Sequence, residues 1–96
     1  MQFVVTALDG TDKGALDRRL KARPDHLDGI EVLKEKGHFI AGGAILNDDG
    51  DMIGSTTYME FDSREALDNL LNNDPYVKGE VWQKIEVRPI KLAFRD

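Results

Sequence analysis

Short apolar runs and segments of helical periodicity alternate along the chain. The run from Gln2 to Leu8 is rich in β-branched residues and apolar on both faces, which is typical of a central strand. A set of apolar positions then follows at steps of four, seven, three and three, which predicts one face of a helix. These positions are Leu16, Leu20, Leu27, Ile30 and Leu33. Because proline lacks an N–H and disfavours helical geometry at the preceding residue, we expect a kink or short break at Arg23-Pro24, with Pro24 beginning a second helical piece.

The second half of the chain repeats this alternation. It predicts strands over residues 39–46, 52–61 and 84–94, a helix over 64–71, and a short turn or helix over 76–82. Gly42 and Gly43 lie inside the first of these strands, where glycine marks a bulge or a close approach by a ligand or another backbone. Pro89 predicts that the last strand lies at an edge of the sheet or carries a bulge.

The order β-α-β-β-α-β predicts one domain over residues 1–96 with an α+β, ferredoxin-like plait. In this fold both helices lie on one face of an antiparallel four-stranded sheet. The other face stays uncovered, and a second copy of the same chain is the simplest cover for its apolar surface. We therefore expect a homodimer.

Net charge and amino-acid composition limit the kinds of partner that the protein can bind. Lys and Arg number 13 against 18 Asp and Glu, and the resulting net charge of −5 argues against nucleic acid and anionic membranes as partners. The chain has no cysteine, which excludes disulfides and thiolate sites and is consistent with a reducing, cytoplasmic compartment. No segment approaches the roughly 20 apolar residues of a membrane helix, and the N-terminus lacks the pattern of a signal peptide.

Of the two histidines, His26 is the better candidate for chemistry. Ala22 lies four residues before it and Ile30 four after, so the ring is predicted at the margin of the buried helix face. Imidazole exchanges protons near neutral pH without a metal. The residues alone nevertheless favour a half-buried histidine that makes one structural hydrogen bond.

Asp74 is the candidate partner of this histidine. In Asp74-Pro75-Tyr76 the aspartate ends the second helix, and a turn explains the motif fully. The functional interpretation is that its carboxylate orients His26 and stabilises the charged ring. The two histidines and the scattered carboxylates match no metal-ligand spacing, so we expect no metal.

Several short motifs together resemble the YciI-like (YCII-related) proteins. They occur in the family's order over nearly the whole chain. The motifs are Arg18-Arg19-Leu20-x-x-Arg23-Pro24-x-His26-Leu27, Gly37-x-x-x-Ala41-Gly42, Gly54-Ser55-Thr56, Asp74-Pro75-Tyr76 and Val87-Arg88-Pro89. One departure is Gly43, which stands where many members have proline and changes the wall of the pocket.

The resemblance implies a dimer of ferredoxin-like plaits whose sheets pack face to face. It also implies a pocket built around a histidine and an aspartate, which fall on His26 and Asp74. Arg23 and Ser55 fall on family positions at this pocket. Gly42, Gly43 and Tyr76 complete the predicted substrate-binding set. Because the family reaches cofactor-free dehydrochlorinases, the resemblance implies proton transfer without a cofactor.

Three functional hypotheses remain at this point. The first is a cofactor-free lyase, isomerase or dehydrochlorinase-like enzyme that uses a His26–Asp74 dyad on a small organic molecule, with Arg23 binding an anionic oxygen and Ser55 donating a hydrogen bond. The second is a non-catalytic module of the same fold that binds a ligand or another protein. The third is a metal-dependent enzyme, which would contain stoichiometric metal.

Overall fold

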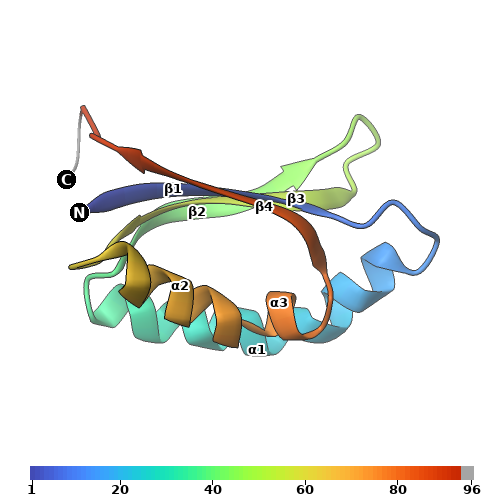
Figure 1. The fold of residues 1–96 in the computed structure, drawn as a ribbon. Coiled ribbons are helices and arrows are strands. Elements are labelled where there is room, and N and C mark those ends of the chain that lie inside the picture. The colour runs from blue at the N-terminus through green and yellow to red at the C-terminus, as the bar shows by residue number, and fades with distance from the viewer. Residues whose placement is uncertain (94–96) are drawn as a thin grey trace.

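The computed structural model describes residues 1–93, and their elements form a plait of one sheet and one layer of helices (Figure 1). The elements are β1 (Gln2–Asp9), α1 (Ala15–Glu35), β2 (Phe39–Leu46), β3 (Met52–Glu60), α2 (Arg64–Asn73), α3 (Pro75–Lys78) and β4 (Trp82–Ile90). The sheet has the strand order β2-β3-β1-β4, and every neighbouring pair is antiparallel. The α+β plait predicted from the sequence is therefore confirmed.

β1 lies between β3 and β4, as its two apolar faces predict. Phe3, Val5 and Ala7 point toward the helices and are at most 2% exposed. The alternate residues of the strand face the open side of the sheet, on which Figure 1 shows no helix. Within residues 1–93, none of the helices has the combination of length and hydropathy that crossing a bilayer requires.

β4 begins and ends earlier than predicted. It runs from Trp82 to Ile90 rather than over residues 84–94, and Phe94 lies outside the described residues. Pro89 pairs with Phe3 of β1, and β4 forms an edge of the sheet, where a residue without an N–H is tolerated.

The break predicted at Pro24 is wrong, because α1 is continuous through it. Proline removes the hydrogen bond to the carbonyl of Leu20 one turn earlier. Both Pro24 and Leu20 are exposed, so water can hydrate that carbonyl. The helix therefore tolerates the proline on its solvent side.

The buried face of α1 also differs from the predicted apolar face. Leu20 and Leu27 are 48% and 42% exposed, whereas Arg19 and His26 are 2% and 8% exposed. Arg19 and His26 lie seven residues apart, which places them two turns apart on one helix face. The inner side of α1 thus carries two basic side chains, and each of them needs a partner there.

The two glycines of β2 have different surroundings. A Cβ on Gly42 would lie 2.8 Å from the Thr56 carbonyl oxygen, so β3 requires glycine at this position. A Cβ on Gly43 would meet nothing within 4 Å. The predicted close approach of another backbone therefore holds for Gly42 and not for Gly43.

Candidate active site

His26 and Asp74 lie in contact where α1 passes the junction of α2 and α3. The His26 Nδ1 atom is 2.9 Å from Oδ1 and 3.1 Å from Oδ2 of Asp74. Asp74 is the N-cap of α3, and its Oδ1 also accepts the Tyr76 N–H at 2.8 Å. An ionised carboxylate only accepts hydrogen bonds, so Nδ1 carries the proton. In the neutral ring, Nε2 is then left with a free lone pair.

Two aromatic side chains fix the plane of this imidazole. The Tyr76 ring stacks on His26 with centroids 3.8 Å apart and an interplanar angle of 12°. The Trp82 ring meets His26 edge-on at 5.7 Å. Burial raises the pKa of the Tyr76 phenol above its ordinary value, against the opposing effect of the positive charges of Arg19 and Arg23. The phenol therefore stays protonated at neutral pH.

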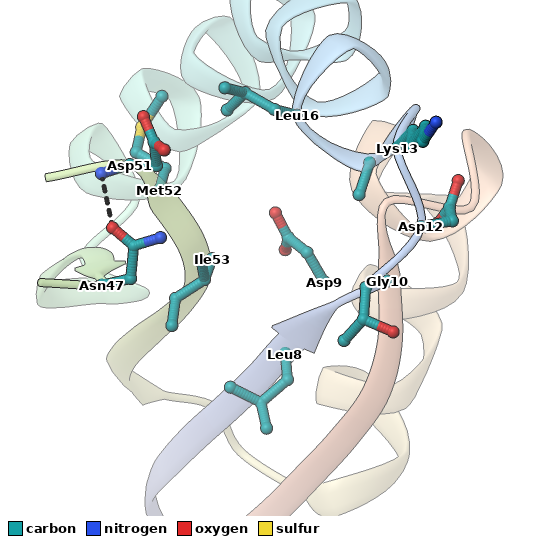
Figure 2. Close-up of a pocket in the computed structure, with 12 residues that line it drawn as sticks. Leu8, Asp9, Gly10, Asp12, Lys13, Leu16, Asn47, Asp51, Met52 and Ile53 are labelled. Atoms are coloured by element: carbon teal, nitrogen blue, oxygen red, sulfur yellow. Dashed lines mark hydrogen bonds between the residues drawn. The ribbon is translucent and has the colours of Figure 1, made fainter. Parts of the chain in front are cut away.

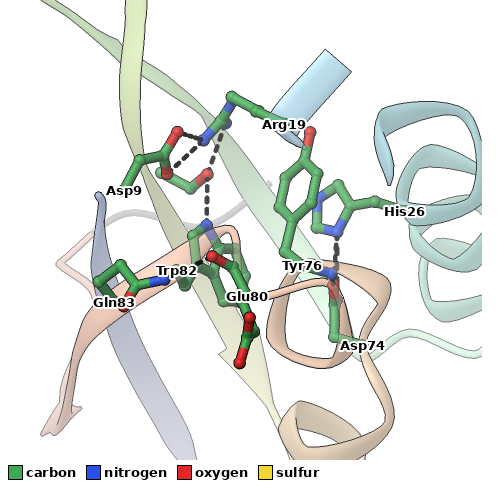
Figure 3. Close-up of polar contacts among 9 residues, drawn as sticks. Asp9, Arg19, His26, Asp74, Tyr76, Glu80, Trp82 and Gln83 are labelled. Atoms are coloured by element: carbon green, nitrogen blue, oxygen red, sulfur yellow. Dashed lines mark hydrogen bonds and ion pairs between the residues drawn. The ribbon is translucent and has the colours of Figure 1, made fainter. Parts of the chain in front are cut away.

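A second polar cluster lies beside these rings (Figure 3). Arg19 Nη1 donates to both carboxylate oxygens of Asp9, at 2.9 and 3.1 Å, and both side chains are 3% exposed. Arg19 Nη2 donates to Ser55 Oγ at 2.7 Å, and Trp82 Nε1 donates to the same oxygen at 3.2 Å. The Arg19 guanidinium lies 4.8 Å from the centre of the Tyr76 ring, which joins the two clusters.

A cavity of about 280 Å³ opens between α1, β2 and β3 beside these clusters. Its size lies near the lower end of the range for small-molecule pockets. The predicted residues that line it are Arg23, His26, Gly42, Gly43, Ser55 and Tyr76. Asp74 is not part of the lining, and it contacts the side of the imidazole that holds Nδ1. Glu31 and Lys34 of α1 also line the cavity.

Sequence reasoning missed Asp9, Arg19 and Trp82 as site residues. A signal existed for Arg19, since it lies seven residues before His26 and so on the same helix face. Asp9 is the last residue of β1 and follows the inward-facing positions 3, 5 and 7. Asp9 is buried because it pairs with Arg19, and the pattern of residues along β1 gives no sign of that partner.

A second cavity, of about 360 Å³, lies at the end of β1. Asp9 points into it, and Leu8, Leu16 and Ile53 surround it (Figure 2). Asp9 lines this cavity, and its ion-pair partner Arg19 lines the other. The lining of the second cavity holds no histidine among residues 1–93. In the same described range, no three or more His, Asp or Glu side chains come together to hold a metal ion.

Fold and site together define a class, namely small α+β plaits with a histidine–aspartate pair beside a cavity between helix and sheet. The family model of the YCII-related domain matches residues 1–91. Protein YciI of Escherichia coli O6:H1 is 35% identical over 98% of this chain and 100% of its own length. The chain therefore belongs to the YCII-related family, as its motifs predict.

Solved structures extend the comparison. The chain resembles the 5-chloro-2-hydroxyhydroquinone dehydrochlorinase TftG of Burkholderia phenoliruptrix, solved with 2,5-dihydroxybenzoquinone, with a TM-score of 0.82 and 30% identity over 95% of this chain and 94% of that one. A dimeric ferredoxin-like protein of unknown function from Jannaschia has a TM-score of 0.54 at 17% identity, over 95% of this chain and 98% of its own. The second likeness concerns the fold alone.

Proposed function

We propose that this protein is an acid–base enzyme in which His26 transfers a proton to or from a small oxygenated ring compound. The observation that carries this proposal is the hydrogen bond from Nδ1 to Asp74, which leaves Nε2 as the free nitrogen of a ring that lines the cavity. Imidazole at such a position can take a proton from a substrate, and the carboxylate then stabilises the imidazolium.

The likeness to a dehydrochlorinase supports elimination as the reaction type. Loss of hydrogen chloride from a chlorinated hydroxyhydroquinone needs a base for the proton and a route for chloride, and it leaves a quinone without any external oxidant. His26 would take the proton. Arg23 and Lys34 would attract an anionic oxygen of the ring, since both line the cavity and carry positive charge.

The test uses a variant that removes the proposed base while keeping the hydrogen bond that holds the side chain. His26→Asn keeps an amide N–H that can donate to Asp74 but has no second nitrogen, so it should lose about 10²–10⁴-fold in turnover. The assay follows chloride release from 5-chloro-2-hydroxyhydroquinone, with the melting temperature as a control for folding. Full activity in a folded His26→Asn protein would leave the alternative, a non-catalytic ligand-binding module.

We also propose that two copies pair through the open faces of their sheets. Val4, Leu8 and Tyr58 lie on that face, and the dimeric neighbour shares the plait. Tyr58→Glu places a charge at the proposed contact and should shift the protein from dimer to monomer in sedimentation experiments. Glu65→Gln, at an exposed position of α2, is the control. A wild-type protein that sediments as a monomer at all concentrations would contradict the pairing.

A further inference from the structure

The side chain of Ser55 has an unusual hydrogen-bonding state. It is 5% exposed and lies on the inner face of β3. Its oxygen accepts one N–H from Arg19 at 2.7 Å and another from Trp82 at 3.2 Å. A hydroxyl oxygen has two lone pairs, so both are in use. The hydroxyl proton finds no acceptor within residues 1–93.

Neither donor can reverse its role. Guanidinium and indole N–H groups donate and never accept. Arg19 is held by both oxygens of Asp9. The Trp82 ring is packed edge-on against His26 and against Tyr76, at 5.7 and 5.4 Å. Ser55 therefore cannot turn its oxygen toward a ligand that brings its own proton.

Ser55 lines the same cavity as His26, and a ligand there is the partner left for its hydroxyl proton. We infer that Arg19 and Trp82 fix Ser55 as an obligate hydrogen-bond donor, so that the cavity selects ligands presenting an acceptor oxygen, such as an enolate, a phenolate or a quinone carbonyl. This inference rests on the proposed function in taking this cavity as the ligand site. Ser55 is thus a specificity-determining residue, and Arg19 and Trp82 are positioning residues.

The fixed donor discriminates by a simple asymmetry. A ligand with an acceptor oxygen completes the hydrogen bonding of Ser55. An amino group at the same place brings a second donor, and both donors then lose their bonds to water without replacement. Sites built for one hydrogen-bonding pattern reject the opposite pattern strongly, because buried polar groups remain unpaired.

The experiment measures the affinity ratio of two ring probes by NMR titration. The probes are 2,5-dihydroxybenzoquinone, which presents acceptor oxygens, and p-phenylenediamine, which presents N–H donors. The wild type should favour the quinone. Ser55→Ala should lower this ratio about tenfold, the worth of one hydrogen bond, and Ser55→Thr should restore it because it keeps the hydroxyl.

Trp82→Phe separates positioning from packing. The variant removes one donor from the Ser55 oxygen and so frees one lone pair, which lets the hydroxyl accept from the diamine. The ratio should fall in Trp82→Phe. In a Ser55→Ala background the same change should alter the ratio by less than about twofold, since no hydroxyl is left to reorient.

Three results would overturn the inference. They are a wild type that does not favour the quinone, a ratio unchanged in Ser55→Ala, and an equal effect of Trp82→Phe with and without Ser55. Loss of the proposed catalysis is distinguishable from these. If His26→Asn keeps full turnover while the ratios behave as expected, the acid–base proposal fails and the donor role of Ser55 stands.

Discussion

Asp74→Asn tests how much the carboxylate contributes beyond holding the ring. The variant keeps the size of the side chain and one side-chain oxygen. In the structure Asp74 Oδ1 accepts the Tyr76 N–H at 2.8 Å, and the remaining oxygen of the asparagine can accept it in the same way. The same oxygen can still accept from His26 Nδ1, which lies at 2.9 Å. What the substitution removes is the negative charge facing an imidazole that becomes positive when it takes a proton.

The size of the effect follows from the change in hydrogen-bond type. A hydrogen bond to a charged group contributes about 1.5–3 kcal/mol, and a neutral one about 0.5–1.5 kcal/mol. The difference is about 1–1.5 kcal/mol, and it applies to the state in which His26 is an imidazolium. Since 1.36 kcal/mol corresponds to a tenfold change in rate, kcat/KM should fall about 5–13-fold.

Chloride release from 5-chloro-2-hydroxyhydroquinone provides the assay for this variant too. A matched control is Ser63→Ala, which removes the N-cap of α2. Ser63 accepts the Ala66 N–H at 3.1 Å and is not among the residues that line the cavity. It should cost about 1 kcal/mol of stability and leave kcat/KM unchanged. If Asp74→Asn keeps wild-type kcat/KM while His26→Asn is inactive, the carboxylate has only a structural role and the dyad is refuted.

Three further results are expected from the structure. Gly42→Ala should lower the free energy of unfolding by about 1–3 kcal/mol, because its methyl group would meet the neighbouring strand at 2.8 Å. Gly43→Ala should not destabilise the protein, and urea unfolding of the two variants measures the difference. The pKa of Asp12 should be about 2 by NMR, and Arg18→Gln should return it toward 3.8, since both Asp12 oxygens bind that guanidinium at 2.7 Å. Because the pKa of Tyr76 is raised, the buried phenol stabilises the fold fully below pH 10.0, and this stabilisation is lost as the pH rises above that value. In urea titrations at alkaline pH, Tyr76→Phe should therefore lose less stability with rising pH than the wild type.

Local patterns were enough to predict the plait. Short apolar runs bounded by turn residues identify the strands, and the order of strands and helices along the chain restricts the possible topologies to a few. They also indicate β1 as the central strand, because its outward positions include the apolar Val4 and Leu8 while its inward positions are apolar too. Each of these patterns involves only a few neighbouring residues, so the strands and helices can be predicted from the sequence alone.

The inner face of α1 could not be predicted in the same way. A periodic pattern ranks side chains by hydrophobicity, so it places Leu20 and Leu27 inside, His26 only at the margin of the buried face, and Arg19 outside it. Arg19 is buried because Asp9 lies opposite it, and His26 because Asp74 does. These partners lie on other elements, and only the tertiary arrangement brings them within reach. The pairing of Ser55 with Trp82 is hidden for the same reason.

The cavity and its polar lining have a common origin. Burial of an apolar side chain contributes about 1.5–3 kcal/mol, but at the positions of Arg19 and His26 this gain is opposed by the cost of leaving Asp9 and Asp74 without their partners. In the same cavity, β2 presents Gly42 and Ala44, which are too small to fill the space. The apolar core instead gathers around α2, with Phe3 and Leu67 among its most buried members. A larger residue at Gly42 would clash with the Thr56 carbonyl of β3, and an apolar residue at Arg19 or His26 would leave Asp9 or Asp74 without its partner. The small residues of β2 and the paired basic residues of α1 therefore keep the cavity open together.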